Sequence, residues 1–216
     1  MVYKVTFHLD GKGVVFNRRE PLHLDGLLAY YVFMEKYHEI FKQPINRDDP
    51  IIEVDLPLEK VILSGEEVWK ASAILPVGDI VHEKRYYRKN FPQKRADGLT
   101  NGNITITTGH YRSYNNSLQL YLCSKMEAYF DGDYDEVSRL LNKVKRIGQK
   151  RSHGHGNVTM ISYEESKYDY TILNNDKINR YFPHEEGIRM IRPRPPYWAN
   201  EGKVPCFPIG WRMEEA

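Results

Sequence analysis

The amino-acid sequence predicts an α+β fold in which two helices pack on an antiparallel sheet, and three observations lead to this prediction. Several short segments alternate apolar and polar residues, as strands with one buried face do. Two longer segments place apolar residues three and four positions apart, as amphipathic helices do. The two kinds of segment also follow one another in an order that allows both helices to cover the same sheet.

The chain opens with one predicted strand and one predicted helix. Residues 2–9 alternate, with Val5 and Phe7 on the same side, which predicts a strand with one buried face. Residues 24–41 repeat apolar side chains at threes and fours and predict a helix of four or more turns. Asp25 is expected to cap the N-terminus of this helix, a role favoured over that of a catalytic carboxylate.

The middle of the chain predicts a hairpin, a long strand and a second helix. Residues 51–63 and 68–75 are two apolar pieces separated by a polar turn, as in a strand pair. Residues 117–130 alternate most clearly of all and predict one long strand. Asp133 and Glu136 then have the spacing of a capping box, and cations crowd the last turn of the helix that they begin.

Residues 157–163 predict the last strand, which completes the order β-α-β-β-α-β. This is the ferredoxin-like or RNA-recognition arrangement, with two helices on one face of a four-stranded antiparallel sheet. Residues 82–116 interrupt it as an inserted basic hairpin, and the proline-rich residues 183–216 form an irregular wrapping tail with no regular helix or central strand. Residues 1–216 are expected to form a single domain with these two additions.

Composition narrows the class of protein. With 216 residues and 41% hydrophobic content the chain can bury a substantial core. It contains no run of eighteen apolar residues, and its N-terminus lacks the layout of a signal peptide, so we expect a soluble, cytoplasmic protein with no membrane partner. Cys123 and Cys206 are too few for a disulfide framework or a zinc knuckle and are expected to be buried, reduced thiols.

The net charge of +2 conceals two concentrated basic segments. Residues 83–95 hold six Lys and Arg against one acid, and residues 139–151 hold six with none. The rest of the chain is therefore acidic overall. Basic segments on an otherwise acidic protein indicate a polyanionic partner at a defined site, although each segment could also be an ordinary solvated face.

The second basic segment runs into a glycine-rich loop, residues 147–158. Its glycines can take positive φ and turn successive amides toward one anion, and the adjacent cations add full charges. The alternative is a glycine C-cap followed by a tight turn. The first interpretation predicts a grip on a phosphate backbone, with these candidate contacts: Gly148, Lys150, Arg151, His153, Gly154, His155 and Gly156.

The basic insertion mixes aromatic residues with its cations. This mixture suits single-stranded nucleic acid, because rings stack on bases while cations bind phosphates. Tyrosines that pack across a hairpin are the alternative. The candidate RNA contacts here are Lys84, Arg85, Tyr86, Tyr87, Arg88, Lys89, Lys94 and Arg95.

Several other kinds of site lack support in the sequence. The glycine loop follows a helix and does not contain GxxxxGK followed by Ser or Thr, so nucleotide binding of the P-loop type is not expected. His153 and His155 have no nearby cysteine or carboxylate cluster to complete a metal site. We expect no metal and no cofactor.

The pattern GxKxxxGxG, formed by Gly148, Lys150, Gly154 and Gly156 between the second helix and the last strand, resembles that of the RAMP superfamily of CRISPR proteins. Together with residues 21–30, PLHLDGLLAY, the loop is most similar to the RAMP subunit of type IV effector complexes, which caps the 5′ handle of the crRNA. The resemblance implies that the loop contacts the crRNA backbone and that residues 83–112 form a thumb. The partners it implies are the crRNA, the backbone and large subunits of the complex and, indirectly, the target DNA or RNA.

Two functional classes follow from the resemblance. The first is a non-catalytic RNA-binding subunit. The second is a metal-independent endoribonuclease that processes pre-crRNA, in which a histidine acts as general acid or base. Binding is favoured because a catalytic base needs an orienting partner that the sequence does not reveal. An RNA-binding host protein unrelated to CRISPR is a third possibility. The candidate histidines of the nuclease are His8, His23, His110, His153 and His155.

Overall fold

A computed structural model gives the fold of the protein and describes residues 1–16, 21–39, 51–90, 108 and 112–212. The end of the predicted first helix, the candidate contacts Lys94 and Arg95, and His110 lie outside these described residues. Among the described residues, no helix is long and apolar enough to cross a membrane.

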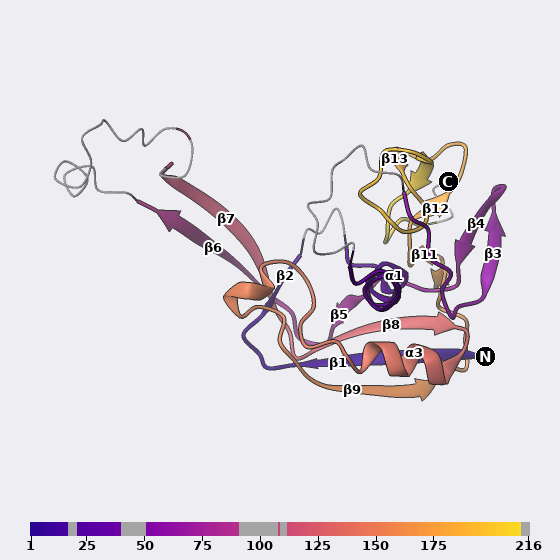
Figure 1. The fold of residues 1–216 in the computed structure, drawn as a ribbon, viewed down its shortest axis with the longest axis horizontal. Helices are drawn as coiled ribbons and strands as arrows, with labels where there is room; N and C mark the ends of the chain where they lie inside the picture. The colour runs from indigo at the N-terminus through magenta and orange to yellow at the C-terminus, as the bar shows by residue number, and fades with distance from the viewer. Residues whose placement is uncertain (17–20, 40–50, 91–107, 109–111, 213–216) are drawn as a thin grey trace.

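The main sheet contains four strands in the order β5-β8-β1-β9, and every neighbouring pair is antiparallel (Figure 1). The strands are β1 (Val2–Leu9), β5 (Leu75–Val77), β8 (Lys125–Asp131) and β9 (Val158–Glu165). In the register of the sheet, Val5 of β1 lies opposite Ala128 of β8 and Tyr163 of β9. The strands predicted at residues 2–9 and 157–163 are confirmed.

Two helices pack on this sheet, which confirms the α+β class. They are α1 (Leu24–Lys36) and α3 (Tyr134–Leu141). One hydrophobic core joins Phe7 of β1, Phe130 of β8, Leu28 of α1 and Leu140 of α3, and all four are fully buried. Each such side chain stabilises the fold by about 1.5–3 kcal/mol relative to exposure.

The start of α3 confirms the predicted cap, since the Asp133 carboxylate accepts a hydrogen bond from the Glu136 amide at 3.0 Å. The predicted basic last turn is wrong, because the helix ends at Leu141 and holds only Arg139 there. After Leu141 the backbone leaves the helix, yet Val144 and Ile147 remain buried. Apolar spacing therefore continued past the end of the helix, and the sequence pattern alone could not mark that end.

Asp25 does not cap α1, which is a second correction. The N-cap is His23, and Asp25 lies in the first turn with no exposed surface. Its carboxylate accepts hydrogen bonds from the Tyr197 hydroxyl at 2.8 Å and pairs with the Arg180 guanidinium at 3.3 Å. These partners come from the far end of the chain and outweigh the local capping role. The helix is also shorter than predicted, because Tyr37 leaves the helical conformation.

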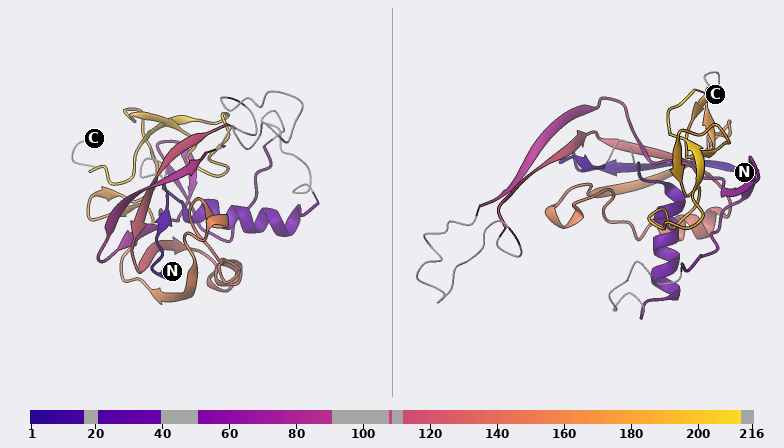
Figure 2. Two further views of the ribbon diagram at one scale, coloured as in Figure 1. Left: turned by 90° about the vertical axis from the view of Figure 1, so that its left-hand side faces the viewer. Right: turned by 90° about the horizontal axis from the view of Figure 1, so that it is seen from above.

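The predicted strand at residues 117–130 is two strands in different sheets. The first is β7 (Tyr114–Leu122), and the strand conformation is interrupted at Cys123 and Ser124 before β8 begins. β7 pairs antiparallel with β6 (Val81–Lys89) and with β2 (Val14–Val15). Alternation persists through the break because both strands have a buried face there, so periodicity did not reveal it. We call β6 and β7 the ribbon, and it extends away from the main sheet (Figures 1 and 2).

The strand pair predicted within residues 51–75 is present but shorter. β3 (Lys60–Leu63) and β4 (Glu66–Trp69) form a separate two-stranded sheet. Ser64 and Gly65 join them with φ of 47° and 84°, as a tight two-residue hairpin turn requires. The apolar residues after β4 serve the core instead, and Leu75 begins β5 of the main sheet.

The C-terminal segment contains more regular structure than predicted. β10 (Leu173–Asn174) pairs with β11 (Lys177–Ile178), and β12 (Phe182–Pro183), β13 (Arg189–Ile191) and β14 (Val204–Phe207) form a sheet in the order β12-β14-β13. The expectation of no central strand is wrong, because β14 is central although it contains Pro205. Proline lacks only the amide hydrogen, and the Pro205 carbonyl still accepts from the His184 amide at 3.1 Å.

Both cysteines are buried free thiols, as expected. Burial raises the pKa of the Cys206 thiol to about 12. It therefore remains protonated at neutral pH and behaves as a small apolar side chain.

His23 is sealed beside the buried Asp25–Arg180 pair. Its ring packs against the rings of Tyr181 and Tyr197, with centroid distances of 4.5 and 4.7 Å, and neither ring nitrogen has a hydrogen-bond partner among the described residues. Burial, together with the positive charge of Arg180, holds the pKa of His23 well below its ordinary value. The native protein therefore keeps this histidine neutral.

A pH dependence of stability follows from the buried His23. The unfolded chain protonates this residue near pH 6.5, whereas the native state resists protonation, so the contribution is fully present above that pH and is lost as the pH falls below it. The slope approaches about 1.4 kcal/mol per pH unit for one proton. We expect His23→Phe to show a shallower fall in the free energy of unfolding between pH 6.5 and 5, measured by urea denaturation. His82→Phe, at an exposed histidine, is the control, and an unchanged slope in His23→Phe would contradict the prediction.

Candidate nucleic-acid interface

The two ends of the glycine loop are fastened to each other and to β2. The Ile147 amide donates to the Gly156 carbonyl at 2.8 Å, and the Gly156 amide donates to the Gly13 carbonyl at 2.9 Å. Gly148 and Gly156 have φ of 83° and 66°. A Cβ on Gly148 would lie 2.6 Å from the Val15 carbonyl oxygen, and one on Gly156 would collide with the Ile147 carbonyl. Glycine is therefore required at both positions, and the predicted positive φ is confirmed.

The tip of the loop presents side chains more than amides. Lys150 has φ of 53° and precedes a short 3-10 turn, η3 (Arg151–His153), after which Gly154 has φ of 87°. The His153 amide donates to the Lys150 carbonyl and the Gly154 amide to the Arg151 carbonyl, at 2.9 and 3.1 Å. These two amides are committed within the loop. Lys150, Arg151 and His153 have exposed side chains, so they are the groups of the tip that can meet a ligand.

One face of β6 carries an exposed ring between two cations. The Lys84 ammonium lies 5.4 Å from the centroid of the Tyr86 ring, and the Arg88 guanidinium lies 5.8 Å from it. Tyr86 is 50% exposed, and its neighbour across the ribbon is Ser117. The alternative of aromatic packing across the strands is therefore not what this tyrosine does. The ring and its cations face solvent together.

The opposite face of β6 contacts the glycine loop through Tyr87. The Tyr87 hydroxyl and Nε2 of His155 share a hydrogen bond at 2.9 Å, and the Tyr87 ring meets the His153 ring edge-on at 5.0 Å. His155 is only 6% exposed, so it lies under the ribbon and is not positioned to meet a ligand directly. This contact brings together the two stretches that the sequence singled out separately.

Other side chains of the ribbon that the sequence predicts as RNA contacts are less available, because their groups already have partners or are partly buried. The Arg85 guanidinium makes two hydrogen bonds to the Glu83 carboxylate, at 2.9 and 3.1 Å. The hydrogen bonds from the Arg85 guanidinium in turn lower the pKa of the Glu83 carboxyl. Arg88 also donates to the Asn115 side chain at 3.2 Å, and Lys89 is half-buried. Lys84 and Arg88 therefore face solvent beside Tyr86, whereas the charge of Arg85 is balanced locally.

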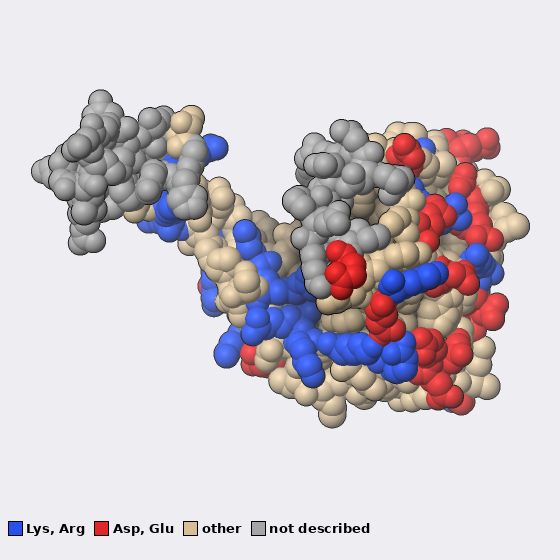
Figure 3. All heavy atoms as spheres, viewed as in Figure 1, with Lys and Arg blue, Asp and Glu red and all other residues tan. Residues whose placement is uncertain are grey.

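The second basic segment, residues 139–151, also contains both neutralised and exposed cations. Arg139 and Lys143 both form ion pairs with Glu35 of α1, whereas Lys145 and Arg146 are exposed next to the loop. Figure 3 shows Lys and Arg gathered where the ribbon joins the main sheet, with Asp and Glu more frequent on the β3–β4 side. We call the exposed cations of the glycine loop and the ribbon together the basic surface, in which the ribbon cations lie on the face of β6 that points away from the loop. It consists of Lys84, Arg88, Lys145, Arg146, Lys150 and Arg151.

Sequence reasoning missed one residue at this surface. Tyr30 of α1 lies under the guanidinium of Arg151, with 5.8 Å between the guanidinium carbon and the ring centroid. The two residues are distant in the chain, and the helical pattern identified Tyr31 instead, as part of the apolar stripe. No local sequence signal marks Tyr30, because Arg151 comes next to it only when the chain folds.

Among the described residues, the candidate catalytic histidines lie in three separate places. The His8 ring shares a hydrogen bond with the Ser162 hydroxyl at 3.0 Å on the main sheet, and His23 is sealed in the core. His153 and His155 lie at the glycine loop. In the described part of the chain, no three His, Cys, Asp or Glu side chains are placed to hold a metal ion.

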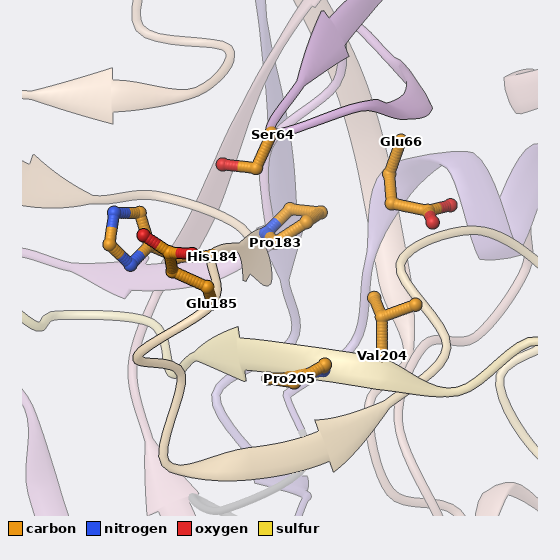
Figure 4. Close-up of a pocket in the computed structure, with 7 residues that line it drawn as sticks. All are labelled: Ser64, Glu66, Pro183, His184, Glu185, Val204 and Pro205. Atoms are coloured by element: carbon orange, nitrogen blue, oxygen red, sulfur yellow. The ribbon is translucent and has the colours of Figure 1, made fainter.

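A surface hollow lies apart from the basic surface, between the β3–β4 turn and the sheet that contains β14 (Figure 4). Its charged lining residues are Glu66 and Glu185, with His184 beside them. Two carboxylates repel a phosphate. The hollow is therefore unsuited to RNA, and the basic surface is the better candidate for a polyanion.

The fold and this surface define an α+β protein with a concentrated cationic face that carries exposed aromatic rings. The chain belongs to the family described as CRISPR type IV associated protein Csf3, which it matches over residues 2–207. It is therefore a type IV CRISPR-associated protein, as the resemblance found in the sequence implied. No curated protein matches the chain.

The contact between Tyr87 and His155 predicts a specific loss of stability. Tyr87→Phe removes the hydrogen bond and leaves buried Nε2 of His155 without its partner, which costs about 1–3 kcal/mol. We expect a lower free energy of unfolding in urea and faster amide exchange in β6 and residues 150–156. Tyr86→Phe is the matched control, since the neighbouring ring is exposed. Equal stability of the two variants would show that the contact does not hold the ribbon on the loop.

Proposed function

We propose that the chain is an RNA-binding subunit of a type IV CRISPR ribonucleoprotein complex that caps the 5′ handle of the crRNA without catalysis. The single observation that carries this proposal is the Tyr87–His155 contact, because it fixes the ribbon against the glycine loop and so keeps the two groups of exposed cations close together. Phosphates of a single strand are bound by cations and its bases by rings. Lys150 and Arg151 supply the first kind of group, and Tyr86 supplies the second.

The arrangement of the main sheet supports the ferredoxin-like part of the proposal. Along the chain its elements run β1, α1, β5, β8, α3 and β9, with the strands in the spatial order β5-β8-β1-β9. This is the order β-α-β-β-α-β, with both helices contributing to one core. The ribbon enters between β5 and β8, which fits a thumb-like insertion over residues 82–116. Residues 183–216 are the wrapping tail of the same domain.

In this proposal the ribbon reaches outward from the main sheet to contact other molecules of the complex. The partners are the crRNA, the backbone and large subunits and, through them, the target nucleic acid. The base of the ribbon reaches the hydrophobic core through Tyr121, whereas residues 114–117 and Tyr86 are exposed. RNA and a neighbouring subunit would supply contacts to these exposed residues, as binding stabilises the bound state of any segment.

The binding role is favoured over the alternative, a metal-independent endoribonuclease. General acid–base catalysis needs a histidine within reach of substrate and oriented by a partner. His23 is inaccessible, and His155 uses one ring nitrogen on Tyr87 beneath the ribbon. His153 is exposed, and its Nδ1 shares a hydrogen bond with the Ser152 hydroxyl at 3.3 Å. Among the residues that the structure describes, none of these three has the accessible carboxylate partner of a typical catalytic base.

The phosphate contacts are tested by removing two charges at the tip of the loop. Lys150→Ala with Arg151→Ala should weaken binding of single-stranded repeat RNA and reduce the steepness of its salt dependence. Each lost phosphate contact lowers the slope of log K against log salt by about 0.7. Fluorescence anisotropy between 50 and 300 mM salt measures both quantities.

Lys167→Ala with Lys203→Ala is the matched control, because both lysines are exposed and lie away from the basic surface. This variant removes the same net charge and should leave the slope close to that of the parent protein. An unchanged affinity and slope in the loop variant would count against the glycine loop as the RNA contact.

The absence of catalysis is tested with labelled pre-crRNA containing the repeat. Incubation of an excess of the purified protein with this RNA in EDTA should leave the RNA intact on a denaturing gel, since the alternative chemistry needs no metal. Cleavage at one position, abolished by His153→Ala, would instead establish the nuclease.

A further inference from the structure

We infer that Tyr30 of α1, together with Arg151, forms a stacking platform for one nucleobase of the bound RNA. The inference rests on the proposed function, because it assigns a base-binding site to the same surface. It adds a residue from α1 to a surface otherwise made of the glycine loop and the ribbon.

The Tyr30 ring contacts two neighbouring side chains and is supported by one of them, Tyr31. The guanidinium carbon of Arg151 lies 5.8 Å from the centroid of the Tyr30 ring, and the Tyr31 ring meets it edge-on, at 5.2 Å and 87°. The Tyr31 hydroxyl donates to the Lys143 carbonyl at 3.4 Å, and burial raises the pKa of Tyr31. Tyr31 is thus anchored, while Tyr30 remains 36% exposed.

The position of Tyr30 on α1 makes the platform rigid. All buried residues of α1 lie in its first half, between Leu24 and Ala29, and Tyr30 follows directly after them. A helix fixed by core residues such as Leu28 holds the next side chain in a defined place. A ring with few rotatable bonds on a fixed backbone loses little conformational entropy on binding.

The chemistry of the pair favours a nucleobase over a second phosphate. A planar guanidinium over an aromatic ring presents stacking surfaces to which a base adds, whereas the phosphate of the same nucleotide can meet Lys150 or Arg151. An exposed ring–cation contact by itself contributes only about 0.5–1 kcal/mol. Because Tyr86 with Lys84 and Arg88 forms a similar set on the ribbon, ring–cation stacks lie on two sides of the basic surface.

The experiment compares a ligand that has bases with one that lacks them. Four proteins are titrated with single-stranded RNA and with inorganic polyphosphate of similar charge: the parent, Tyr30→Ala, Tyr30→Phe and Tyr168→Ala. The last is the control, because Tyr168 is a 66% exposed tyrosine elsewhere on the molecule. Stacking on one base predicts that Tyr30→Ala weakens RNA binding by about fivefold or more. Its salt slope and its affinity for polyphosphate should match the parent, and Tyr30→Phe should retain most of the RNA affinity.

The other outcomes overturn the inference. If Tyr30→Ala weakens both ligands equally or lowers the salt slope, Tyr30 acts only by positioning the charge of Arg151. If it changes neither ligand, Tyr30 has no role in binding. A third outcome separates the two proposals. If the parent binds RNA, the Lys150 and Arg151 substitutions reduce the salt slope, and Tyr30→Ala behaves as the parent, this inference fails and the proposed function stands. If the parent does not bind RNA at all, both fail.

Discussion

The guanidinium of Arg180 holds together three parts of the chain that are far apart in sequence. It pairs with Asp25 at the start of α1, donates to the carbonyl oxygens of Trp69 at the end of β4 and Ala71 just after it, and donates to the Pro193 carbonyl in the C-terminal segment. Arg180 and Asp25 have no exposed surface. Removing either partner of such a pair would leave a buried charge uncompensated, at a cost of about 3–5 kcal/mol. The placement of α1 and that of the C-terminal segment therefore depend on each other.

The basic surface inherits its geometry from this arrangement. Because α1 is held at its start, Tyr30 has a defined place beneath Arg151. The glycine loop is fastened at its base to β2, and β2 also pairs with β7 of the ribbon. Tyr87 then adds a contact between β6 and the loop through His155. Three separate segments are thereby held in fixed positions, so under the proposed function a strand of RNA would meet groups that are already in place.

Charge separation gives this surface its character. Glutamates neutralise Arg85, Arg139 and Lys143, while the loop cations are exposed. Acidic side chains are more frequent toward β3 and β4 (Figure 3). A polyanion is attracted to one side of such a molecule and repelled from the other. The net charge of +2 conceals this division, which explains how a nearly neutral chain can present a strongly basic face.

Local signals in the sequence determined much of this protein. Alternation determined β1 and β9 of the main sheet, the Asp133 cap began α3, and the positive φ of Gly148, Gly154 and Gly156 followed from glycine itself. The glycine loop together with residues 21–30 also led to the correct CRISPR type. Only the tertiary structure decided that Asp25 pairs with Arg180, that residues 117–130 divide between two sheets, and that His155 is buried under Tyr87 while Tyr30 is exposed beside Arg151. Periodicity and capping depend on neighbours within a few residues, whereas these contacts join residues brought together by folding, for which no short-range pattern exists.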